Sequence, residues 1–158
     1  MVVAYGLERR CGGFTRGALV TEEIPDTVDL AQMAHANDPR LRDRGWVARV
    51  SRQIADITRT LHAARFAHND LKWRNLLVDG GASPTVYLID CPSGGYYRGV
   101  VLDYRIVKDL ACLDKLARHW LSRSQRLRFY LDYARHGRVT DEDRKRIGRI
   151  VRFFHGRE

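Results

Sequence analysis

The stretch that most constrains this chain is a polar octapeptide that lies between an amphipathic segment and an apolar run. It spans residues 68–75, with the sequence HNDLKWRN, and is followed directly by LLV. A second acidic point, Asp90, ends the apolar segment 86–89, VYLI. Asp-Gly at positions 79–80, between the two apolar runs, is typical of a β-hairpin. The pattern therefore predicts a tight polar loop, then two short strands, the second of which ends at a carboxylate.

The residue types in this loop fit phosphoryl transfer. That reaction needs a carboxylate that orients an acceptor hydroxyl, and cations that neutralise charge on the phosphates. Asp70 has the position of the base, and Lys72 beside it can stabilise the transferring group. Asn75, five residues on, and Asp90 offer amide and carboxylate oxygens, which Mg²⁺ prefers as ligands. We therefore interpret Asp70 and Lys72 as catalytic, and Asn75 and Asp90 as metal ligands.

The same pattern resembles the catalytic and metal-binding loops of the protein-kinase-like fold, H-x-D-L-K-x-x-N followed by a strand ending in Asp. The resemblance implies that His68 braces the loop from beneath and that Asp109 anchors its backbone. An alternative for Asp109 is a carboxylate at a helix N-terminus, where it meets the dipole. Two departures set this chain apart. Asn69 replaces the Arg of many regulated kinases, and Cys91-Pro92 replaces Phe-Gly, so an ordinary protein kinase is not expected.

Upstream of the loop, residues 1–22 predict a β-hairpin with a long connecting loop. In the resembled fold this hairpin is a remnant of the small N-terminal lobe, and residues 23–28 are the hinge that holds adenine. The resemblance implies that Thr21 is the gatekeeper and that Glu22 and Ile24 offer backbone groups to the nucleotide. Without the later motifs, the same residues would be read as an ordinary edge strand and turn.

Residues 29–158 predict a helical C-terminal lobe, which makes the whole an α+β, protein-kinase-like fold. The clearest amphipathic helix spans residues 46–65, where four apolar side chains recur at helical spacing and are expected to face the core: Val50, Ile54, Ile57 and Leu61. His62 near its end is given a surface role. Further helices are expected at 28–36, 108–121, 122–133 and 140–154, with Gly137 and Thr140 as stop and cap signals.

Two further segments, LVTEEIP at 19–25 and SRSQRLRF at 122–129, make the chain resemble the bacterial lipopolysaccharide kinase (Kdo/WaaP) family. The resemblance covers nearly the whole chain. It implies ATP- and Mg²⁺-dependent phosphorylation of a sugar in the lipid A–core region, at the inner face of the cytoplasmic membrane. A small-molecule kinase of the aminoglycoside or choline type fits less well, because those enzymes usually lack a lysine placed as Lys72 is.

The charge of the chain favours an anionic partner. Its formal net charge is +9, with 28 Lys and Arg, which suits a phosphorylated glycolipid or the anionic face of the inner membrane; a solvated, Arg-rich surface is the alternative. Nucleic acid is not expected, because aromatic residues are not interleaved with the basic ones. No apolar run reaches the ~18 residues of a membrane span, and no signal segment begins the chain. These features, with three cysteines read as free thiols, indicate a cytoplasmic protein, peripheral at the inner membrane.

One departure from the family pattern concerns the nucleotide. A kinase-like domain also uses a glycine-rich loop, a strand Lys and a helix Glu, all upstream of the hinge. Only about 20 residues precede the hinge here, and no Lys occurs before Lys72. We therefore expect a phosphotransferase of weak activity as written. A gene start assigned too far downstream, a decayed fragment and a true short form are the three explanations; in the last case the chain is a catalytically inactive, kinase-like binding module.

Overall fold

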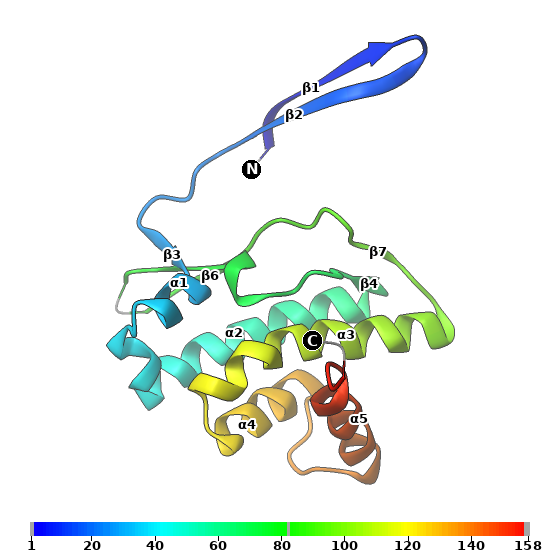
Figure 1. Ribbon diagram of the computed structural model, residues 1–158. Helices are drawn as coiled ribbons and strands as arrows, with labels where there is room; N and C mark the ends of the chain where they lie inside the picture. Colours follow the sequence, from blue (N-terminus) through cyan, green and yellow to red (C-terminus); the bar gives the residue numbers. More distant parts are fainter. Residues whose placement is uncertain (1, 82, 157–158) are drawn as a thin grey trace.

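The computed structural model describes residues 2–81 and 83–156 and shows a helical body from which one β-hairpin projects (Figure 1). The strands are β1 (Val2–Arg10), β2 (Gly13–Thr21), β3 (Thr27–Asp29), β4 (Phe66–Ala67), β5 (Leu76–Asp79), β6 (Val86–Leu88) and β7 (Gly95–Tyr96). The α-helices are α1 (Leu30–His35), α2 (Arg44–Ala63), α3 (Gly99–Trp120), α4 (Arg123–Ala134) and α5 (Asp141–Arg152), with short 3-10 helices η1 (Pro39–Arg42) and η2 (Trp73–Asn75). Among the described helices, none combines the length and apolar character of a bilayer-crossing segment.

The β1–β2 hairpin is regular but has no core of its own. Its strands pair antiparallel, and every residue of both strands is exposed. The turn consists of two residues, Cys11 and Gly12, with φ of 51° and 81°, as a two-residue hairpin turn of type I′ requires. The predicted long loop is therefore wrong. Residues 8–10 belong to β1, and a hairpin exposed on both faces shows no alternation that would reveal this.

β5 is the centre of the three-stranded sheet that carries the polar loop. The strand order is β3-β5-β6, and both pairings are antiparallel. Leu76 and Val78 of β5 face the core and are 0% and 1% exposed, since alternate residues of a strand share a face. Beyond the ladder, the amide of Ile89 donates to the carbonyl of Asn75 at 3.0 Å. The chain just after β6 therefore lies beside the chain just before β5.

α2 supplies a continuous buried stripe to the body. Its buried residues recur at spacings of three and four: Trp46, Val47, Val50, Ile54, Ala55, Thr58 and His62. The predicted core positions Val50 and Ile54 are confirmed, whereas Ile57 and Leu61 are half-buried. The helix begins two residues before the predicted start, because the Asp43 carboxylate accepts from the amides of Gly45 and Trp46 at 2.7 and 3.0 Å and so caps it.

α3 begins at Gly99, nine residues before the predicted start at Lys108. Its first turns carry apolar side chains on the exposed face, including Val100 at 85% and Val101 at 49% exposed. An exposed apolar face weakens the helical periodicity from which a start is predicted. The correction matters for Asp109, because it lies inside the helix and not at its N-terminus.

The last two helices begin with capping boxes. Ser122 caps α4 with Gln125, and Thr140 caps α5 with Asp143, so the predicted cap at Thr140 is confirmed. α4 packs on α2, and α5 packs on α3. α4 ends at Arg135, which adopts left-handed backbone with φ of 58°, rather than at Gly137.

Candidate functional site

The polar loop runs from the end of β4 to the start of β5, beneath the β3-β5-β6 sheet. α2 ends at Ala63, and Arg65 turns the chain with φ of 62°. β4 then pairs with β7, which brings the segment after Asp90 back across the loop. Gly94 allows this close approach, because a Cβ there would lie 2.3 Å from Cys91 Sγ and 2.5 Å from the Phe66 ring.

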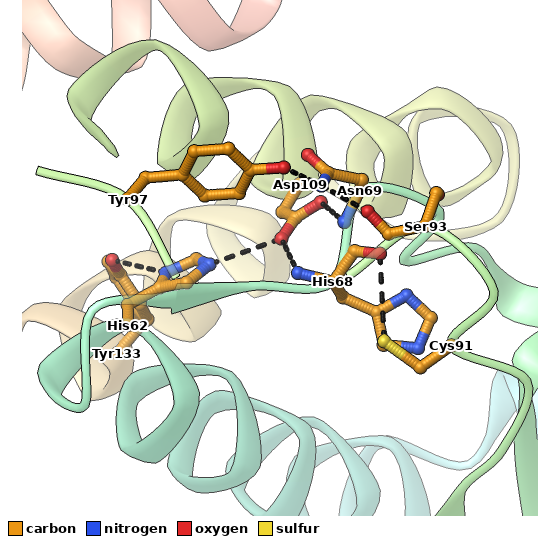
Figure 2. A network of polar contacts seen from close by, with 8 residues as sticks. All are labelled: His62, His68, Asn69, Cys91, Ser93, Tyr97, Asp109 and Tyr133. Carbon is orange, nitrogen blue, oxygen red and sulfur yellow. Dashed lines mark hydrogen bonds and ion pairs between the residues drawn. The ribbon is translucent and has the colours of Figure 1, made fainter. Parts of the chain in front are cut away.

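A buried carboxylate on α3 holds the start of the loop. Asp109 is 0% exposed. Its Oδ2 accepts from the amide of His68 at 2.8 Å, and its Oδ1 accepts from the amide of Asn69 at 2.9 Å (Figure 2). Two hydrogen bonds from adjacent amides to one carboxylate fix both the position and the tilt of this turn.

Asn69, the residue before Asp70, has left-handed backbone with φ of 65°. Its side-chain amide donates to the carbonyl of Ser93 at 2.6 Å and to the hydroxyl of Tyr97 at 2.9 Å (Figure 2). A non-glycine residue with positive φ is held there by its surroundings. Asp70 therefore follows a turn that is fixed on both its backbone and its side chain.

Asp70 is the focus of three side chains from its own loop. Lys72 Nζ lies 2.5 Å from Oδ1, and Arg74 lies 3.2 Å from Oδ2. The amide of Asn75 donates to the Asp70 carbonyl at 2.8 Å and to Oδ2 at 3.3 Å. The hydrogen bond from Lys72 holds the pKa of Asp70 below its usual range, with smaller contributions from Arg74 and Asn75. Asp70 therefore stays an ionised acceptor at neutral pH.

Asn75 and Asp90 lie at the same end of the β5–β6 hairpin. Asn75 directly precedes β5 and is buried, whereas Asp90 follows Ile89 and is exposed. The backbone bond between Ile89 and Asn75 fixes the two neighbouring segments to each other. Asn75 donates through Nδ2, which leaves its Oδ1 as an acceptor. Together the two residues offer one amide oxygen and one carboxylate next to Asp70.

His68 lies under the loop and is 1% exposed. Within the described residues, neither nitrogen of its ring has a hydrogen-bond partner. The thiol of Cys91 lies 3.8 Å from the His68 carbonyl, and Figure 2 shows the ring beside this cysteine. The ring therefore fills space between the loop and the segment after Asp90.

The segment interpreted as the hinge lies at the other end of the sheet. β3 begins three residues after Ile24, and Thr27 pairs with Asp79 at the far end of β5 from Asn75. The Thr27 hydroxyl donates to the Ile24 carbonyl at 2.8 Å. Thr21, Glu22 and Ile24 thus connect the projecting hairpin to the sheet whose opposite end carries Asn75.

Sequence reasoning missed two residues of this region, His62 and Tyr133. It placed His62 on the surface, but His62 is 6% exposed and lies between Tyr133 and Asp109 (Figure 2). A signal was available, because His62 follows Ile54 and Thr58 at intervals of four and so continues the buried stripe of α2. Trp73 is also buried, and its Nε1 donates to the Leu113 carbonyl at 3.1 Å, so it does not line the space around Asp70.

The fold and the sequence were compared with known proteins. The profile of the lipopolysaccharide kinase (Kdo/WaaP) family matches residues 1–133. A solved structure, "WaaP in complex with acyl carrier protein", superposes with a TM-score of 0.74 and 23% identity, over 97% of this chain and 66% of that chain. The chain thus spans about two thirds of that structure, which confirms the predicted kinase-like α+β fold. No curated protein matches the sequence.

Proposed function

Because the chain belongs to the lipopolysaccharide kinase (Kdo/WaaP) family, we propose that it transfers the γ-phosphoryl group of ATP to a sugar hydroxyl in the lipid A–core region of lipopolysaccharide. The observation that carries the proposal is the loop around Asp70. A carboxylate, a lysine and an amide meet there within hydrogen-bond distance. A rigid α3 carboxylate anchors the turn that presents them.

In the proposed reaction, Asp70 orients the acceptor hydroxyl and accepts its proton. The hydroxyl oxygen forms a bond to the γ-phosphorus as the bond to the β-phosphate oxygen breaks, and ADP leaves. Lys72 lies against Asp70 and carries a positive charge toward the transferring group. Arg74 adds a second cation on the same side of the carboxylate. These charges stabilise the negative charge that is spread over the phosphoryl oxygens.

Asn75 and Asp90 are the proposed ligands of Mg²⁺. Among the described residues, no group of three His, Cys, Asp or Glu side chains could hold a metal ion. An amide oxygen and one carboxylate nevertheless fit Mg²⁺, since this ion keeps several waters and takes its remaining ligands from phosphates. When bound there, Mg²⁺ would neutralise charge on the nucleotide phosphates.

The hinge is the proposed site for adenine, and the proposed division of the chain follows from it. Residues 1–22 would be the remnant of the N-terminal lobe, 23–28 the hinge and 29–158 the C-terminal lobe. The Ile24 carbonyl already accepts from Thr27, so the backbone amide of Ile24 is the group proposed for adenine. The backbone of Glu22 is proposed as the second contact.

An acyl carrier protein is a second proposed partner, and an apolar cavity supports it. The cavity has a volume of about 440 Å³ and lies among α2, α3, α4 and α5. Its walls include Val50, Ile54, Trp73, Leu113, Phe129 and Ile150. Pockets of this size and character accept a largely apolar ligand. Arg123 and Arg126 also line the cavity and suit the anionic phosphate of a carrier's prosthetic arm.

Binding of a long-chain acyl carrier protein, compared with the unloaded carrier, tests this partner. We expect the loaded form to bind at least about tenfold more tightly, since burial of several methylenes is favourable. Ile54→Trp, which fills the cavity, should remove the difference, whereas Val100→Trp on the exposed face of α3 should keep it. Equal binding of loaded and unloaded carrier would exclude the cavity as an acyl site.

The kinase proposal is tested with Mg-ATP and a lipopolysaccharide core oligosaccharide as acceptor. We expect labelled phosphate to appear on the sugar, and Asp70→Asn to lower kcat by about 10²–10⁴, the usual contribution of a general base. Asp79→Asn, at the other end of β5, is the matched control and should retain turnover. Undiminished turnover in Asp70→Asn would show that Asp70 is not the base. Absence of turnover in the unchanged chain would favour the inactive binding module.

The basic charge supports peripheral contact with an anionic lipid surface, where such an acceptor would lie. The chain carries a formal net charge of +9. Basic residues near an anionic leaflet contribute about 1 kcal/mol each, and salt screens the attraction. Salt-sensitive sedimentation with vesicles that contain anionic lipid, and none with neutral vesicles, is the expected result.

A further inference from the structure

The anchor of the polar loop does not end at Asp109. On its far side, Asp109 Oδ2 lies 3.4 Å from His62 Nε2, and His62 Nδ1 lies 2.9 Å from the Tyr133 hydroxyl (Figure 2). His62 comes from the last turn of α2 and Tyr133 from the last turn of α4. Three helices therefore meet in a row of side chains that leads to the loop.

The direction of the hydrogen bonds follows from the chemistry of the partners. The backbone amides of His68 and Asn69 can only donate, so both Asp109 oxygens act as acceptors. His62 Nε2 then carries the hydrogen that faces Oδ2. In the neutral ring, Nδ1 has a lone pair and accepts from Tyr133. The row thus has one consistent order, from hydroxyl to imidazole to carboxylate to backbone.

Every member of this row is buried. Asp109 is 0%, His62 6% and Tyr133 7% exposed. Burial raises the pKa of Tyr133 to about 12, so its hydroxyl keeps the proton that it donates. In such surroundings an unpaired polar group is costly, because no water replaces the lost partner. The loss of the hydroxyl would therefore change the orientation of the imidazole as well as its hydrogen bonding.

We propose that His62 and Tyr133 are positioning residues for Asp70, which act by orienting the Asp109 carboxylate that holds the loop. This inference rests on the proposed role of Asp70. A tilt of the imidazole moves the Oδ2 that it shares with the amide of His68. Because Asn69 takes its left-handed turn from the other oxygen, the turn before Asp70 depends on the same carboxylate. A displacement of about 1 Å at a reacting group can cost 10²-fold in rate.

Amide hydrogen exchange tests the inference without any need for turnover. Tyr133→Phe removes the hydroxyl and keeps the ring. Tyr130→Phe is the matched control, since Tyr130 lies on the same helix, is 5% exposed and donates to Asp143 at 2.9 Å, outside the row. We expect Tyr133→Phe to speed exchange at His68 and Asn69 about fivefold relative to Leu110 in α3, as loss of one buried hydrogen bond predicts.

Tyr130→Phe should leave that ratio unchanged, although both variants lose stability. If the ratio is equal in the two variants, or unchanged in Tyr133→Phe, the positioning role is overturned. Where the unchanged chain turns over, Tyr133→Phe should lower kcat and leave KM for ATP unchanged; a rise in KM alone would contradict the inference. Absence of turnover in the unchanged chain would count against the proposed function only, because the exchange measurement does not depend on it.

Discussion

Asp70 shows how neighbours set the state of a single residue. Its carboxylate lies against Lys72 at 2.5 Å and Arg74 at 3.2 Å. The hydrogen bond from Lys72 is the first cause of its lowered pKa. A lowered native pKa stabilises the fold above the pKa of the unfolded chain, and this stabilisation is lost as pH falls.

The state of Asp70 can be measured directly. We expect Lys72→Met to raise the pKa of Asp70 toward its ordinary value, because the closest cation is removed. Carbon NMR of the Asp70 carboxyl across an acid titration reports this pKa without any assay of turnover. Arg74→Met is the matched control and should raise it less, since its contact is longer. A larger shift in Arg74→Met would contradict the assignment of Lys72 as the main partner.

Asp143 provides a second test of charge at the residue scale. Burial alone would raise its pKa, but hydrogen bonds from Thr140, His136 and Tyr130 outweigh burial and hold the pKa below its usual range. Its stabilisation is therefore present above about pH 4 and is lost as pH falls further. We expect Asp143→Asn to cost about 1–3 kcal/mol of unfolding free energy at pH 7.

Chemical denaturation at a series of pH values measures the effect of Asp143→Asn. The stability difference between this variant and the unchanged chain should narrow as pH falls below about 4, where the carboxylate of the unchanged chain is protonated. Asp141→Asn, on the exposed side of the same first turn, is the control and should show a smaller difference. A difference that stays constant with pH would show that Asp143 is not held as a carboxylate.

The polar loop was predictable at this scale and its buried anchor was not. The spacing of Asp70, Asn75 and Asp90 is encoded within 21 positions of sequence, so local pattern alone indicates it. The row from Tyr133 to Asp109 joins residues 71 and 47 positions apart from His62. Such contacts depend on how α2, α3 and α4 pack, which no local pattern contains.

At the scale of elements, the β1–β2 hairpin differs from the rest of the chain. All eighteen residues of its strands are exposed. They include the large apolar side chains Val3, Tyr5, Leu7, Phe14 and Leu19. An isolated two-stranded hairpin is only marginally stable in water. We therefore expect amides of β1 and β2 to exchange far faster than those of β5, whose residues Leu76 and Val78 lie in the core.

Hydrogen exchange resolved along the sequence measures this contrast, and a dilution series controls for self-association. Fast exchange at every concentration is the expected result. Protection of the hairpin equal to that of β5 in the isolated chain would show that the strands are covered, contrary to the structure. The same exposure explains why the sequence predicted a hairpin but not its turn, since no buried face fixes where the strands end.

Helix caps were predictable where side chains make them. Thr140 and Asp143 form a reciprocal cap that the sequence signals three residues apart. The start of α3 was not predictable in this way, since Arg98 makes no side-chain cap and Val100 is exposed. The difference placed Asp109 at a helix start in the sequence interpretation and inside a helix in the structure.

At the scale of the whole molecule, the proposed site and the apolar cavity share one residue. Trp73 belongs to η2, between Lys72 and Asn75, and its ring lines the 440 Å³ cavity. The tryptophan is held by the Leu113 carbonyl of α3. The body is thus arranged with the polar side of one loop toward Asp70 and its apolar side toward the cavity, which is how one segment serves both the core and the surface.

The central claim is that the loop around Asp70 and the end of β6 bind Mg-ATP for phosphoryl transfer. Titration calorimetry of ATP with and without Mg²⁺ tests it most directly, on the unchanged chain, on Asp90→Asn and on the control Asp79→Asn. The account predicts Mg²⁺-dependent binding that Asp90→Asn weakens by about tenfold or more and Asp79→Asn leaves unchanged. Equal affinity in Asp90→Asn, or no Mg²⁺-dependent binding by the unchanged chain, would contradict it.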